Sequence, residues 1–193
     1  MSKLNVLDIL EVDLEKVIKF AQNYLSADKG VKKNIIKYIA DVEKIYNKLI
    51  ENTIPFYEIL YNDKNFEEKF PIQYAKFMSA YSYNRRDYFY SCLRVQEGIS
   101  VLEKKKRYFQ KNNINKDYLD SPLFRNYDLS TAIDTALDDF ERHLREISSK
   151  MKQGEYTESR KQLQLFTDDT RPTFKHIQRL LVDLENLKWK LDS

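Results

Sequence analysis

Glycine is scarce in this chain, and no stretch of it is continuously apolar. Only three of the 193 residues are glycine, well below the usual share of about 7%. Because tight hairpin turns depend on glycine, its scarcity excludes most hairpins and disfavours a β-sheet fold. No run approaches the roughly 18 apolar residues that a membrane-spanning helix needs. The composition, 42% hydrophobic and 33% charged, predicts a soluble helical protein.

Cysteine is nearly absent as well. The one cysteine, Cys92, has no partner for an intramolecular disulfide, which is typical of a reducing compartment. Asp8, Glu11 and Asp13 interrupt the amino-terminal segment, so it lacks the apolar region of a secretory signal. We therefore expect a cytoplasmic protein without a membrane partner, in which Cys92 is a small core residue and not a nucleophile.

Apolar residues recur at intervals of three and four along most of the chain, which is the pattern of amphipathic helices. The pattern, divided by the glycines and prolines, predicts helices over residues 4–27, 31–60, 72–111, 128–153, 156–166 and 172–191. Residues 62–70 and 112–127 are expected to be loops, and residues 167–170 to cap the last helix. The expected fold class is all-α: one domain over residues 1–193, an elongated antiparallel bundle of five or six helices with a long central third helix.

The helix expected over residues 72–111 is the most aromatic and most basic part of the chain. Seven of its residues fall near one face and are expected to be buried: Tyr74, Met78, Tyr81, Phe89, Cys92, Ile99 and Leu102. A second face, about half a turn away, carries Tyr83, Arg86, Tyr90 and Arg94. Tyrosine and arginine are over-represented in protein interfaces, so these four are the candidate partner-binding residues.

Arg85 falls on the face expected to be buried, where an unpaired charge costs several kcal/mol. Two arrangements remain open: a packed stem with the head group in water, or a buried guanidinium paired with an acidic residue of the following helix. That helix carries Asp134, Asp138, Asp139 and Glu141. Residues 81–116 hold nine Lys or Arg against three Asp or Glu, whereas residues 117–170 hold seven against twelve. These opposite balances indicate either attraction between neighbouring helices or symmetry mates, or a face that binds a polyanion.

Motifs for metal or nucleotide chemistry are missing. Three widely spaced glycines cannot form the GxGxxG or GxxxxGK[ST] loops of nucleotide sites, and no GxSxG elbow is present. The two histidines are too few for the Glu-x-x-His motifs of di-iron bundles. Asp139 and His143 lie one helical turn apart, but two ligands do not complete a metal site. No metal and no cofactor are expected.

One short pattern has catalytic spacing. Arg171 and His176 are separated by four residues, in the first turns of the helix expected over residues 172–191. The pattern resembles the catalytic motif of the HEPN ribonucleases, small helical bundles in which an arginine and a histidine near a helix start, paired across a dimer, cleave RNA. The resemblance implies that Arg171 stabilises charge on the phosphate and that His176 assists proton transfer.

Three functions therefore remain open. The preferred one is a non-catalytic interaction or scaffold protein that docks a protein partner, or associates with itself, through Tyr83, Arg86, Tyr90 and Arg94. The alternative among enzymes is a dimeric HEPN-like ribonuclease that uses Arg171 and His176. The third is a nucleic-acid-binding protein, in which basic residues of 85–111 contact phosphates and tyrosines stack on bases. Its candidate polyanion contacts are Lys104, Lys105, Arg107 and Lys111.

Overall fold

The structure is a computed structural model that describes residues 6–62, 65–103 and 126–193. Five helices account for nearly all of these residues, and no strand occurs among them. The helices are α1 (Val6–Gln22), α2 (Lys29–Asn62), α3 (Phe66–Glu103), α5 (Asn126–Lys152) and α6 (Tyr156–Asp192). None of them is long and apolar enough to cross a membrane. The expected all-α fold is confirmed.

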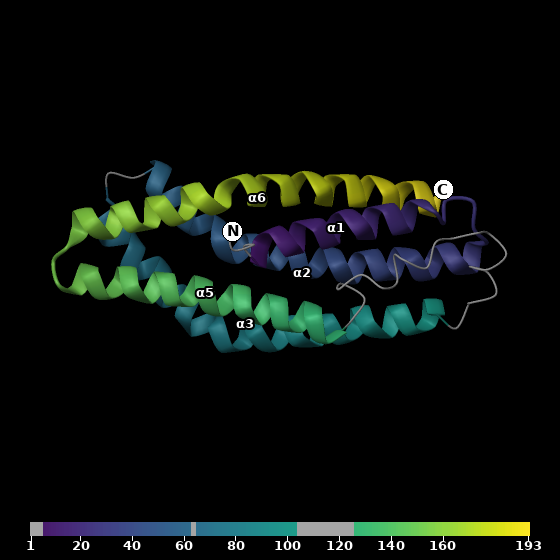
Figure 1. Cartoon of the computed structure of the whole chain (residues 1–193), viewed down its shortest axis with the longest axis horizontal. Coiled ribbons are helices and arrows are strands. Elements are labelled where there is room, and N and C mark those ends of the chain that lie inside the picture. Colours follow the sequence, from purple (N-terminus) through teal and green to yellow (C-terminus); the bar gives the residue numbers. More distant parts are fainter. Residues whose placement is uncertain (1–5, 63–64, 104–125) are drawn as a thin grey trace, which may run out of the picture.

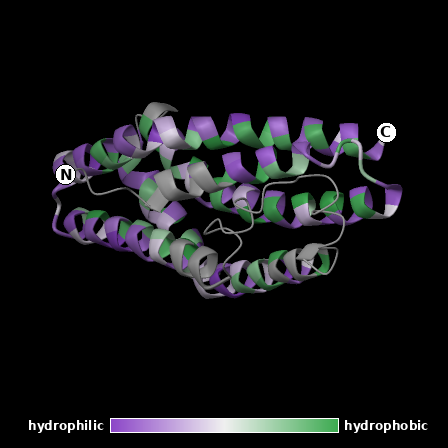
Figure 2. Cartoon of the chain, turned by 45° about the vertical axis from the view of Figure 1, so that its right-hand side comes forward, coloured by the Kyte–Doolittle hydropathy of each residue, from purple (hydrophilic) through white to green (hydrophobic). Residues whose placement is uncertain are grey.

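The helices form an elongated bundle in which consecutive helices run in opposite directions (Figure 1). α3 is the longest of the described helices and packs against α2 and α5. α6 extends along most of the bundle and packs against α1, α2 and α5. Each described helix carries both hydrophobic and hydrophilic residues, as amphipathic helices do (Figure 2).

The reversal from α5 to α6 depends on Gly154. Its φ of +81° lies in the left-handed region that glycine adopts without steric cost. The Gly154 N–H donates to the Met151 carbonyl and the Glu155 N–H to the Lys150 carbonyl, both at 3.0 Å. This pair of hydrogen bonds closes the last turn of α5. The expected helix end at Gly154 is confirmed.

Two groups of buried side chains form the core. The larger joins α1, α2, the second half of α3, the first half of α5 and the second half of α6. The smaller is aromatic and centres on Phe56 of α2, which is 1% exposed. The Phe56 ring centroid lies 5.9 Å from Phe70, 6.0 Å from Phe77 and 5.5 Å from Phe140. Edge-to-face ring packing of this kind ties α2, α3 and α5 together.

The helix break expected around residues 167–170 is wrong, because α6 continues through Pro172. Thr167 and Thr170 do not cap a helix. Their hydroxyls donate to carbonyl oxygens of the preceding turn, at 2.9 and 2.8 Å. Buried residues recur at three and four across the proline: Leu163, Thr167, Thr170, Phe174, Ile177, Leu181 and Leu184. Burial of this continuous stripe outweighs the roughly 3 kcal/mol by which an internal proline disfavours a helix.

The other helix boundaries differ less from expectation. α3 begins at Phe66 and not after Pro71, because the side chains of Phe66 and Phe70 are buried in the aromatic group. The loop expected over residues 62–70 is therefore mostly helical. α1 ends at Gln22, earlier than expected. Pro55 lies inside α2 without ending it, as predicted.

The buried face of α3 is only partly the one expected. Its buried and half-buried residues alternate at steps of four and three: Phe70, Tyr74, Phe77, Tyr81, Asn84, Tyr88, Ser91 and Val95. Cys92 is buried as predicted, and Tyr74, Met78 and Tyr81 are half-buried against the aromatic group, but Phe89 is 51% exposed. The side chains of Ile99 and Leu102 lie outside the described part. The buried face differs from the expected one because it includes the polar residues Asn84 and Ser91. A pattern of apolar residues alone does not identify these two positions as buried.

Candidate interaction surface on α3

One side of α3 presents large side chains to solvent. Tyr83 is 62% exposed, Tyr90 53% and Leu93 38%. These residues belong to a set of exposed positions spaced by four and three. We call this set the outer face of α3: Ile72, Lys76, Ser79, Tyr83, Arg86, Tyr90, Leu93 and Glu97. A second regular seam thus runs along α3, about half a turn from the buried one.

A polar network fixes the rotation of α3 on α2. The Asn84 side-chain amide donates to the Asn52 carbonyl oxygen, and the Asn52 amide donates to the Tyr88 hydroxyl, both at 3.1 Å. Burial raises the pKa of Tyr88 above its ordinary value, so the hydroxyl stays neutral. Since Asn84 and Tyr88 are held against α2, Tyr83 and Tyr90 are directed outward.

Tyr83 is partly anchored to α2 by a cation. The Lys48 ammonium lies 5.2 Å from the Tyr83 ring centroid and 5.9 Å from that of Tyr88. Lys48 also forms a hydrogen-bonded ion pair with Asp87. That hydrogen bond holds the pKa of the Asp87 carboxyl below its ordinary value. The Tyr83 ring therefore has a defined position, although most of it remains open to solvent.

Arg94 differs from the other three predicted partner-binding residues. Its Nε lies 3.4 Å from an Asp41 carboxylate oxygen of α2, and its Nη2 donates to the Ser91 hydroxyl at 2.8 Å. The Arg94 guanidinium thus joins α3 to α2. Tyr83, Arg86 and Tyr90 are the predicted residues that share the outer face.

Arg85 combines features of the two expected arrangements. Its Nη2 lies 2.7 Å from Asp134 Oδ2 and its Nη1 3.0 Å from Asp138 Oδ1, as pairing with the following helix required. The side chain remains 34% exposed, so it lies at an edge and not in the core. Tyr81 completes the group, because its hydroxyl donates to Asp138 at 2.7 Å and its ring lies 5.6 Å from the guanidinium. The group fixes α5 beside α3.

Cys92 lines a groove of about 340 Å³ between α3 and α5, beside Phe89 and Asp134. Burial, with the nearby carboxylate of Asp134, raises the pKa of the Cys92 thiol to about 12. Because the thiolate is the reactive form, we expect the folded protein to react very slowly with a thiol-specific dye at pH 7–8. The same protein in denaturant should react fully within minutes. Rapid labelling without denaturant would show that the thiol is accessible and wrongly placed.

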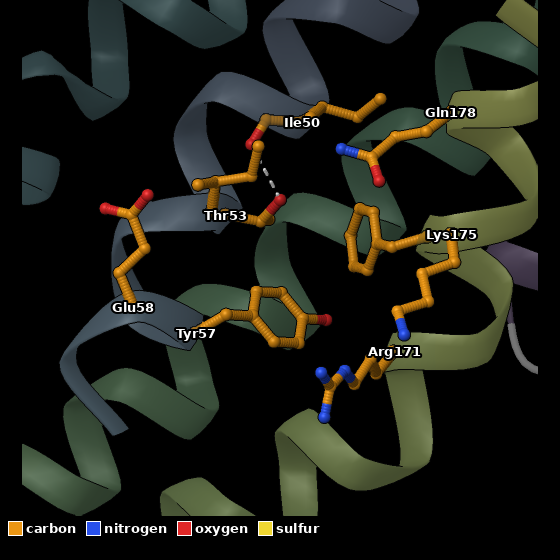
Figure 3. A pocket seen from close by; sticks show the side chains of 9 residues that line it. Ile50, Thr53, Tyr57, Glu58, Arg171, Lys175 and Gln178 are labelled. Carbon is orange, nitrogen blue, oxygen red and sulfur yellow. Dashed lines mark hydrogen bonds between the residues drawn. The ribbon is translucent and has the colours of Figure 1, made fainter. Parts of the chain in front are cut away.

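Arg171 and His176 face different neighbours. Arg171 lines a groove of about 250 Å³ between α2 and α6, with Tyr57 and Lys175 (Figure 3). His176 instead faces Glu11 and Glu15 of α1. Five residues on a helix correspond to a rotation of about 140°, and both residues lie inside α6 and not at a helix start. The geometry gives no support for a shared catalytic site within one chain.

The remaining candidate residues contribute little to a functional site. Lys104, Lys105, Arg107 and Lys111 lie outside the described residues. Asp139 is paired with Arg142 at 2.9 Å. The His143 ring packs 5.0 Å from that of Phe166. Asp139 and His143 are therefore each engaged in ordinary helix-surface contacts.

Comparisons with protein-family models, with curated proteins and with solved structures each found no match. The outer face of α3 is therefore interpreted from its own residues. Ile72 and Leu93 belong to this face, although the sequence analysis did not include them. The regular spacing from Ile72 to Glu97, readable in the sequence, is the signal that identifies them.

Proposed function

We propose that the chain is a non-catalytic helical interaction protein, and that the outer face of α3 pairs with the same face of a second copy. The observation that carries the proposal is the exposure of Tyr83, Tyr90 and Leu93 on one helix, in line with Arg86. Exposed apolar side chains that occur singly need no explanation, but several large ones close together on one helix face are typical of an interaction site.

The spacing of the outer face supports a helix as the partner. Steps of four and three average 3.5 residues, which is the repeat of helices that pack side by side in coiled coils. α3 has 38 residues and so offers a rod of about 57 Å. Tyr83 and Tyr90 supply large, rigid contact surfaces that lose little side-chain entropy on binding. A second α3 helix fits this surface in length and in repeat.

Charge and ring chemistry favour an antiparallel pair. In a parallel dimer Arg86 would lie beside Arg86 of the second copy, and like charges repel. In an antiparallel pair with a twofold axis level with residue 88, Arg86 lies opposite Tyr90 of the second copy, and Tyr83 lies opposite Leu93. A guanidinium over a tyrosine ring contributes about 0.5–2 kcal/mol. Each dimer would contain two such Arg86–Tyr90 contacts.

The test is sedimentation equilibrium over a range of protein concentrations. We expect the wild-type chain to form a dimer, and Tyr83→Ala with Tyr90→Ala to raise its dissociation constant at least tenfold, because truncating an interface tyrosine commonly costs about 1–2 kcal/mol or more. A matched control removes two exposed side chains of α6, Leu165→Ala with Trp189→Ala, and should leave the constant unchanged. A wild-type chain that stays monomeric throughout, or a control that weakens the dimer equally, contradicts the proposal.

Charge reversal distinguishes the two orientations. In an antiparallel pair, Arg86→Glu removes both contacts with Tyr90, and a mixed dimer with wild type should have an intermediate affinity. In a parallel pair, the introduced glutamate of the variant would face Arg86 of the wild-type copy, and the mixed dimer would be tighter than either homodimer. Sedimentation of the two proteins separately and mixed measures which order holds.

A further inference from the structure

Three potential metal ligands from two helices meet at one place on the bundle. Glu11 and Glu15 lie one turn apart on α1, and His176 lies on α6. The His176 Nε2 is 3.7 Å from Glu11 Oε1 and 3.5 Å from Glu15 Oε1. One ligand atom of each residue lies within 4.8 Å of the other two. The sequence does not bring these residues together, because 161 positions separate Glu15 from His176.

Packing on both sides fixes this meeting point. On α1, Leu14, Val17 and Ile18 are buried beside the glutamates. On α6, Phe174 and Ile177 are buried on either side of His176. Because residues at i and i+4 share one face of a helix, Glu11 and Glu15 both project toward α6. The positions of the three side chains therefore follow from the contact between α1 and α6.

The surroundings of the His176 Nε2 are suited to a bound ion. The side chain as a whole is 41% exposed, but Nε2 itself is shielded from solvent and has no hydrogen-bond partner among the described residues. The exposed area thus belongs to the rest of the side chain. A shielded ring nitrogen without a partner is unfavourable, since it has lost its hydrogen bonds to water. The nitrogen and the two carboxylates lie around the same small volume.

The distances from the His176 Nε2 to the two carboxylate oxygens fit a shared metal ion better than direct hydrogen bonds. Hydrogen bonds between nitrogen and oxygen are about 2.7–3.2 Å long, shorter than the 3.5 and 3.7 Å found here. Ligands about 2.0–2.1 Å from a tetrahedral zinc ion are about 3.4 Å from one another. The two separations from the His176 Nε2 are thus within about 0.3 Å of those that a tetrahedral ion requires, and the two carboxylate oxygens lie within 4.8 Å of each other.

The ligand types favour a transition-metal ion over calcium or magnesium. Imidazole nitrogen with carboxylate oxygen suits zinc, whereas calcium and magnesium prefer oxygen ligands alone. Three protein ligands leave a fourth tetrahedral position for water. We propose that Glu11, Glu15 and His176 form a zinc site that joins α1 to α6. Binding would hold the amino-terminal helix against the bundle, because either the His176 bond or both glutamate bonds must break before α1 can separate from α6.

The first test uses the wild-type chain without an affinity tag. His143 and His176 are the two histidines of the chain, so an imidazole nitrogen–proton NMR correlation resolves each of them. We expect one equivalent of Zn²⁺ to shift the ring signals of His176 and to leave those of His143 in place. No shift at either ring, or a larger shift at His143, overturns the proposal.

The second test measures Zn²⁺ affinity by calorimetry. Glu15→Gln and His176→Gln should each weaken binding more than tenfold, because each removes one of three protein ligands. His143→Gln is the matched control and should bind as tightly as wild type, since the His143 ring packs on Phe166. Unchanged affinity in Glu15→Gln and His176→Gln overturns the proposal. Circular dichroism of each variant verifies that its helices are intact.

Discussion

Replacing Phe77 by alanine is expected to lower the free energy of unfolding by about 3–5 kcal/mol. The Phe77 side chain is 5% exposed. Its ring centroid lies 5.3 Å from that of Phe140, 5.5 Å from Tyr81 and 6.0 Å from Phe56. Removing the ring leaves a cavity between α2, α3 and α5 that three neighbouring rings cannot fill without leaving their own contacts. Urea denaturation monitored by circular dichroism measures the loss.

Phe89 provides the matched control on the same helix. Because its ring is about half exposed, Phe89→Ala should change the free energy of unfolding by no more than about 0.5 kcal/mol. Both variants should be measured at a concentration low enough for the chain to be monomeric. The helical spacing of apolar residues alone predicts a buried Phe89 and therefore a large loss for Phe89→Ala. Equal losses for Phe77→Ala and Phe89→Ala would contradict the described orientation of α3.

Helix periodicity predicted the helices well but not the rotation of α3. In α1, α5 and the second half of α6, apolar residues occupy one face and charged residues the other, so the pattern identifies the buried side. In α3, aromatic residues occur on all sides, and both Phe77 and Phe89 are plausible core residues by type. Asn84 and Ser91 determine which face of α3 is buried, because the Asn84 side chain hydrogen-bonds to Asn52 of α2. That partner is 32 residues away and is not visible in local spacing.

The candidate sites, too, could be predicted only where local spacing or charge was enough to place the residues. Tyr83, Arg86 and Tyr90 could be predicted as an outward row because their spacing alone places them together. An acidic partner for Arg85 on the following helix could be predicted because a basic helix is followed by an acidic one, but the sequence did not distinguish Asp134 and Asp138 from Asp139 and Glu141. The meeting of His176 with the glutamates of α1 could not be predicted, since it requires knowing that α1 packs on α6.

Pro172→Ala is expected to raise the free energy of unfolding by about 1–2 kcal/mol. In the middle of α6, Pro172 lacks the N–H that would bond to the carbonyl of Asp168, and proline is about 3 kcal/mol less favourable than alanine inside a helix. Because Pro172 is exposed, its replacement removes little packing. Part of the gain is lost because proline also restricts the unfolded chain, by up to about 1 kcal/mol. A higher urea midpoint with an unchanged slope measures the stabilisation.

The sign of this effect distinguishes one helix from two. If a break at residues 167–170 made Pro172 the first-turn residue of a separate helix, the proline would be well suited to its position, and alanine would give no gain. The Thr170 hydroxyl would then cap the new helix. It instead donates to the Phe166 carbonyl in the turn before it, which is the pattern of a helix interior. A loss of stability in Pro172→Ala would contradict a continuous α6.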